Sequence, residues 1–246
     1  MRIAVCFTGH IRDYDLTNFK TNFSDIVTSQ GDNIDYFIST WNTEGHRCKQ
    51  WNTDTINITE IMNDLKPKSV LIQDFNRDYF IHKYQTREWI NHSHLSDCTT
   101  LPDAVSMWYS NNSVYELVYK YQQVHNFTYD IIVKTRFDVL LDTPIDYNYI
   151  IDSIKSNCVY IPKWHGKWFE ISHGITDYFG IGPYELMSEY LTVFDNIYTL
   201  LSLPNIPHTG EGLLYAQLLS NNINIKRLET TGFSIKRPLN VIEKII

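Results

Sequence analysis

The chain has 246 residues, of which 43% are hydrophobic and 20% are charged, and its formal net charge is −7 at pH 7. This length and composition predict one globular domain with a substantial core. The negative charge argues against a nucleic-acid coat and against attraction to acidic membranes. We find no apolar stretch of about 18 residues and no signal peptide, so we expect no membrane span and a cytoplasmic location.

Strands and helices are predicted to alternate over roughly the first 75 residues. The ranges Arg2 to Phe7, Asp35 to Thr40 and Ser69 to Ile72 are short and apolar, as buried strands are. Apolar residues recur at helical spacing over 16–28 and 58–65. This order is typical of a parallel sheet with crossover helices, so we expect an α/β fold.

The first predicted strand runs into a turn that contains candidate ligand-binding residues. Thr8, Gly9 and Arg12 lie in this turn, and glycine lets a backbone turn sharply or approach a ligand closely. In open α/β sheets, ligands bind at the carboxyl ends of the strands. The turn does not match the GxGxxG pattern, so this signal is weak when taken alone.

The stretch from Tyr129 to Asp142, YDIIVKTRFDVLLD, has the most informative pattern in the chain. Its apolar first half predicts a buried strand, after which Lys134, Arg136 and Asp138 occupy alternate positions. Alternate residues of an extended chain share a face, so these three charges would line one side. One interpretation is an ion pair at a strand end. The other is an anion site in which the cations hold phosphate oxygens and Asp138 holds a divalent ion.

Further elements are predicted on both sides of this stretch. Residues 76–101 are polar and poorly periodic, which indicates a long loop or short helices, and Asp103 is expected to cap a helix that ends near His125. Downstream we expect strands over 158–162, 177–182 and 224–228, and helices over 144–154, 183–201 and 212–219.

The C-terminal half contains two carboxylates that are candidates for a general base, Asp177 and Glu211. Asp177 lies in a glycine-bounded turn, where it could equally serve as a turn or helix cap. Glu211 stands at a predicted helix start, where the helix dipole favours a carboxylate without any chemistry. His208 is a candidate metal ligand or diphosphate contact, although a lone histidine is more often structural.

Five segments, taken in their order along the chain, resemble the nucleotide-sugar-dependent glycosyltransferases of the GT-A fold. They are CFTGHIRD, DYFISTWN, YDIIVKTRFDVLL, HGITDYFGIGPYELM and HTGEGLLYAQLL, and they span nearly the whole chain. The likeness is greatest to enzymes of large DNA viruses and bacterial surface-polysaccharide loci, which implies the host cytoplasm if the protein is viral. It implies one Rossmann-like domain with a nucleotide-sugar-binding half over 1–142 and an acceptor-side half over 143–246.

The resemblance also implies an activity and a cofactor. Such enzymes transfer a sugar, here a hexosyl or deoxyhexosyl group, from a nucleotide-diphosphate sugar to a glycan or another hydroxyl acceptor. A D-x-D motif holds Mn²⁺ or Mg²⁺ on the diphosphate. This chain has Arg136 where the motif has its first Asp, and only Asp138 remains. A guanidinium can neutralise phosphate charge directly, so metal-dependent and metal-independent variants both stay open.

The chemistry of glycosyl transfer assigns roles to these candidates. The departing nucleoside diphosphate gains negative charge, which we expect Lys134, Arg136 and a metal on Asp138 to stabilise. In an inverting transfer a base takes the proton of the acceptor hydroxyl. We expect Asp177 to be that base, with Glu211 as its rival.

Two other functions stay open. A non-catalytic nucleotide- or sugar-binding protein could keep the same fold, because fold does not fix function. A sugar nucleotidyltransferase usually has a Gly-rich, Lys-containing loop after the first strand, and the turn TGHIRD is poor in both residue types.

Overall fold

We describe the protein from a computed structural model. The structure describes residues 1–11, 33–42, 58–84, 101–141, 144–152, 156–162, 175–228, 233–236 and 242–244. The helix expected over 16–28 and the candidate ligand Arg12 lie outside these residues.

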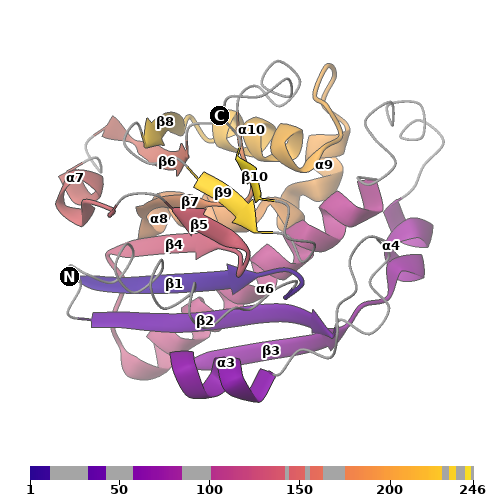
Figure 1. Ribbon diagram of the computed structural model, residues 1–246. Coiled ribbons are helices and arrows are strands. Elements are labelled where there is room, and N and C mark those ends of the chain that lie inside the picture. The colour runs from indigo at the N-terminus through magenta and orange to yellow at the C-terminus, as the bar shows by residue number, and fades with distance from the viewer. Residues whose placement is uncertain are drawn as a thin grey trace.

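A seven-stranded sheet forms the middle of the molecule, in the order β3-β2-β1-β4-β7-β6-β8 (Figure 1). Only β7 runs antiparallel to its neighbours, and every other neighbouring pair in this sheet is parallel. This confirms the expected α/β architecture with a mostly parallel central sheet. The strands are β1 (Arg2–Thr8), β2 (Asn33–Asn42), β3 (Ser69–Asp74), β4 (Ile131–Thr135), β6 (Cys158–Pro162), β7 (Gly180–Pro183) and β8 (Asn224–Leu228).

Helices cover both faces of the sheet and bury its alternating side chains (Figure 1). In β1, Ala4 and Cys6 join the core on the α6 side, whereas Ile3, Val5 and Phe7 join the core on the other side. Because both faces are covered, β1 consists almost entirely of buried residues. The α6 side contains α4 (Arg77–Tyr84), α6 (Leu101–His125), α8 (Tyr184–Leu191), α9 (Ile197–Leu201) and α10 (Gly210–Ser220), and the other side contains α3 (Ile58–Leu65) and α7 (Tyr147–Asp152).

A second, smaller sheet consists of β5 (Val139–Leu141), β9 (Phe233–Lys236) and β10 (Ile242–Lys244), all antiparallel to their neighbours. The sequence did not predict this sheet, because its strands are only three or four residues long and come from distant parts of the chain. None of the helices in the described part of the chain is long and apolar enough to cross a membrane.

Three local predictions were wrong. Asp103 is not a cap, because α6 already begins at Leu101. The helix expected over 183–201 is divided into α8, a short 3₁₀ helix (Val193–Asn196) and α9. The chain also does not stay extended through Asp138: β4 ends at Thr135 and a turn follows.

Candidate active site

The strand order changes direction between β1 and β4, and this junction is where an open α/β sheet binds its ligand. β2 and β3 lie on one side of β1, and β4 lies on the other. β1 and β4 pair in parallel with Phe7 opposite Thr135, so their carboxyl ends lie side by side. The turn after the first strand and the charged end of β4 therefore adjoin.

Gly9 forms the turn after β1 and is fixed by hydrogen bonds from three directions. Its N–H donates to Ser39 O at 3.2 Å and to Ser110 Oγ at 3.1 Å, and its carbonyl accepts from Thr40 Oγ1 at 2.8 Å. Its φ of +84° is strained for a residue with a side chain, and no atom of the described residues lies within 4 Å of where a Cβ would stand. The turn is thus held rigidly while one side of its backbone stays open to a ligand.

Thr8 and Ser110 complete this corner of the sheet. Thr8 is buried, and its Oγ1 has no hydrogen-bond partner among the residues that the structure describes. Ser110 of α6 donates to Ser39 O at 2.9 Å, which ties the helix to the ends of β1 and β2. Sequence analysis missed Ser110, because a serine within a helix carries no local signal for a site.

Aromatic rings lie next to this corner, beyond the ends of β2 and β3. His10 packs edge-on against Phe75, with ring centroids 5.0 Å apart. Trp41, at the end of β2, stacks on Tyr109 of α6 with centroids 5.8 Å apart and an interplanar angle of 21°. Trp41 is only 5% exposed, so these rings form a rigid part of the core beside the turn.

Lys134 is a fully buried cation near the end of β4, opposite Cys6 of β1 and Gly180 of β7. Its ammonium group donates a hydrogen bond to the backbone carbonyl of Asp177. Burial lowers the pKa of Lys134 to about 8, and the charge of Asp177 opposes this shift. The hydrogen bond from Lys134 therefore holds the backbone at Asp177 in place, and the buried ammonium group adds positive charge near the site.

Arg136 and Asp138 form the ion pair that was one of the two interpretations of the sequence. Arg136 Nε donates to Asp138 Oδ1 at 2.8 Å, and its NH2 group donates to Oδ2. The guanidinium also lies over the ring of Tyr178, with Cζ 4.6 Å from the ring centroid. The side chain of Arg136 is 11% exposed and that of Asp138 only 2%, so Arg136 is the cation that solvent can reach.

This geometry bears on the expected metal site. Each oxygen of Asp138 accepts one hydrogen bond from Arg136, so a divalent ion at Asp138 would lie next to the guanidinium. Over the described residues, no group of three or more His, Cys, Asp or Glu side chains is arranged to hold a metal. The role of Asp138 and His208 as ligands of Mn²⁺ or Mg²⁺ therefore stays a prediction.

Asp177 and Glu211 come together where β7 begins and α10 begins. A Cβ on Gly210 would collide with the carboxylate of Asp177, so this carboxylate lies directly against the first residue of α10. Thr209 caps the helix by accepting from Gly212 N at 3.0 Å. Burial first, and the nearby charge of Asp177 second, raise the pKa of Glu211 to about 8.

The structure thus brings most of the predicted site residues to one edge of the sheet. In order across the sheet they are the Thr8–Gly9 turn on β1, the charged end of β4 with Lys134 and Arg136, and the Asp177–Glu211 pair beside β7 and α10. His208 lies two residues before α10 and is half-buried. Adjacent strands are about 4.8 Å apart, so cations and carboxylates lie within the span of one small ligand.

Comparisons with known proteins give no family for this chain. No family model matches it, and no curated protein matches it. Solved structures do match, and one of them is the apo form of mouse xyloside xylosyltransferase 1. That match has 7% sequence identity and a TM-score of 0.43, and covers 92% of this chain and 84% of that chain. A likeness at this level assigns neither a fold family nor an activity.

Proposed function

We propose that the protein is a glycosyltransferase that moves a sugar from a nucleotide-diphosphate sugar to the hydroxyl group of a glycan or similar acceptor. The proposal rests on one observation: positively charged side chains and a pair of carboxyl groups lie near each other at the same edge of the sheet. Cations lie at the end of β4, and the Asp177–Glu211 pair lies one strand further, against the start of α10. Transfer from a diphosphate needs a cation on the leaving group and a base on the acceptor.

The nucleotide is proposed to bind where β1 and β4 end. The open side of Gly9 admits the ligand backbone, and the neighbouring His10 is held against the rings of Trp41 and Phe75. Arg136 contacts the diphosphate, because its pair with Asp138 uses only two of its five N–H groups. Lys134 adds positive charge from within the core.

At the anomeric carbon, one carbon–oxygen bond is made and one is broken. The acceptor oxygen attacks the anomeric carbon as the bond from that carbon to the phosphate oxygen breaks, through an oxocarbenium-like transition state. The electron pair leaves with the nucleoside diphosphate, and the acceptor proton passes to the carboxylate pair. We propose Asp177 as the base of an inverting transfer. Glu211 is its rival, because a raised pKa near the working pH suits a base.

The proposal is tested by mass spectrometry of reactions that contain UDP-, GDP-, ADP- and dTDP-sugars together with hydroxyl acceptors. The expected result is one sugar added to an acceptor and one nucleoside diphosphate released. The double variant Asp177→Asn/Glu211→Gln is the control, since it should bind donor without turnover. Binding of a donor with neither transfer nor slow donor hydrolysis would instead identify a non-catalytic binding protein.

A further inference from the structure

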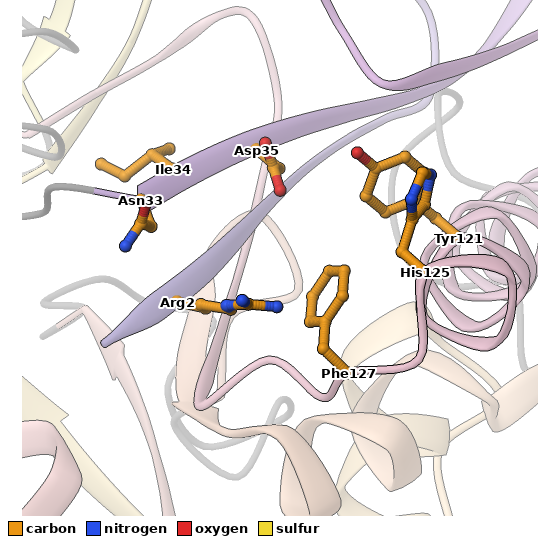
Figure 2. Close-up of a pocket in the computed structure, with 7 residues that line it drawn as sticks. All are labelled: Arg2, Asn33, Ile34, Asp35, Tyr121, His125 and Phe127. Carbon is orange, nitrogen blue, oxygen red and sulfur yellow. The ribbon is translucent and has the colours of Figure 1, made fainter.

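A cavity of about 490 Å³, shown in Figure 2, lies at the starts of β1 and β2. The candidate active site lies at the other ends of these strands. Its lining comes from the starts of β1 and β2, the last turns of α6 and the residues just after α6. The main lining residues are Arg2, Asn33, Asp35, Tyr121, His125 and Phe127. β1 runs from Arg2 to Thr8, a rise of about 20 Å at roughly 3.3 Å per residue. The cavity is therefore separate from the site at Thr8 and Lys134.

The walls of this cavity are held in place by contacts that do not involve a ligand. The guanidinium of Arg2 lies over the ring of Phe127, with Cζ 4.2 Å from the centroid. Asp35 accepts from Tyr129 Oη at 2.7 Å and pairs with Lys68 at 3.3 Å. Side chains that are fixed in this way lose little freedom when a ligand binds.

The aromatic part of the lining is equally ordered. The rings of Tyr121 and His125 lie one helical turn apart on α6, with centroids separated by 4.2 Å. Tyr121 also contacts Phe127 edge-on, with centroids 6.0 Å apart. Figure 2 shows these three rings on one side of the cavity, facing Arg2 and Asp35. These rings pack on one another and under Arg2, so the surface that the cavity offers to a ligand is mainly polar.

The charges around the cavity decide what kind of ligand fits. Arg2 and Lys68 are cationic, but Asp35 pairs with Lys68, and Asp130 accepts from the backbone N–H of Arg2 at 2.6 Å. The last turn of α6 directs its carbonyl groups and the negative end of its dipole toward this region. The balance gives a phosphate or carboxylate no net attraction.

The hydrogen-bonding groups favour a ligand that donates and accepts at many points. Arg2 offers donors, Asp35 offers acceptors, and Asn33 and the Tyr121 hydroxyl offer both. A sugar hydroxyl also donates and accepts, so a row of sugar hydroxyls matches this mainly polar lining. We propose that this cavity is a binding site for a neutral carbohydrate chain, separate from the site of transfer.

Binding is tested directly by saturation-transfer-difference NMR and calorimetry on the full chain, without any activity assay. The probes are maltohexaose, mannohexaose and chitohexaose, with inorganic phosphate and oligogalacturonate as anionic comparisons. The variants Arg2→Ala and Asn33→Ala remove exposed polar groups at strand ends, so the fold should survive both. Lys120→Ala is the matched control, since Lys120 is an exposed cation of α6 that pairs with Glu116.

The expected result is that a neutral hexasaccharide binds to the parent and to Lys120→Ala alike. Arg2→Ala should weaken this binding about tenfold, the equivalent of about 1.4 kcal/mol. Three results would overturn the proposal: no neutral hexasaccharide binds, the two cavity variants bind as the parent does, or only phosphate and oligogalacturonate bind at Arg2. None of these outcomes depends on the proposed transfer reaction, so the two proposals fail separately.

Discussion

Replacing Glu211 with Gln should change how the stability of the protein depends on pH. The folded-state pKa of Glu211 is raised from 4.5 to about 8, chiefly by burial and further by Asp177. Between these two values the folded chain holds a proton that the unfolded chain has released. The free energy of unfolding therefore falls as pH rises from about 4.5 towards 8. Gln cannot titrate, so the variant should lose this dependence.

The size of the effect follows from the same linkage. One proton of difference is worth about 1.4 kcal/mol per pH unit, which sets a limit of about 3 kcal/mol between pH 5 and pH 7.5. Partial exposure of Glu211 and sharing of the proton with Asp177 reduce this, so we expect a fall of about 1–3 kcal/mol in the parent. Measurements stop at pH 7.5 because Lys134, with its pKa lowered to about 8, adds the opposite trend above that value.

Urea unfolding at pH 5, 6, 7 and 7.5 provides the measurement. Glu185→Gln is the matched control, because Glu185 is also a first-turn glutamate of a helix but is exposed. The control should keep the slope of the parent, and Glu211→Gln should flatten it. The same slope in Glu211→Gln and in the parent would show that Glu211 is not the group whose proton is linked to folding.

Three further predictions concern the same edge of the sheet. Asp177→Asn should lower turnover by about 10²–10⁴-fold while donor affinity is kept, because the amide keeps the shape of the carboxylate and removes its basicity. An active Asp177→Asn together with an inactive Glu211→Gln would show that Glu211, not Asp177, is the base. Asp138→Asn should abolish any activation by Mn²⁺ or Mg²⁺. If EDTA does not change the turnover of the parent protein, the metal prediction is wrong. Gly210→Ala should lower the free energy of unfolding by about 1–3 kcal/mol in urea, because its Cβ would overlap the carboxylate of Asp177; unchanged stability would contradict the close approach of Asp177 to α10.

The parallel part of the sheet could be predicted from the sequence because each of its strands has a local signature. Cys158–Pro162 and Asn224–Leu228 were predicted at their observed bounds, and β1 and β2 within two residues. Ligands of open α/β sheets bind at the carboxyl ends of the strands, so the Thr8–Gly9 turn and the end of β4 were both candidates from the sequence. In the structure they lie side by side. For β1 and β6 the prediction succeeded because burial on both faces leaves a continuous apolar run, whereas β8 is only partly buried.

The remaining features depend on contacts between distant residues, which a single sequence does not reveal. The turn after Thr135 could not be seen, because an alternating pattern is equally compatible with a strand that continues. The contact of Asp177 with the start of α10 depends on two residues 33 positions apart in the chain and on a glycine that leaves room. The cavity at Arg2 likewise joins the starts of two strands to the end of α6.

The central claim is that a nucleoside diphosphate binds where β1 and β4 end, and hydrogen–deuterium exchange tests it most directly. Exchange of the parent is compared with and without UDP, GDP, ADP and dTDP, each in turn. The account predicts that one of them slows exchange in peptides covering 5–11 and 131–141, and leaves peptides covering 121–127 unchanged. Protection confined to 121–127 and the start of β2, or no protection by any of the four, would contradict it.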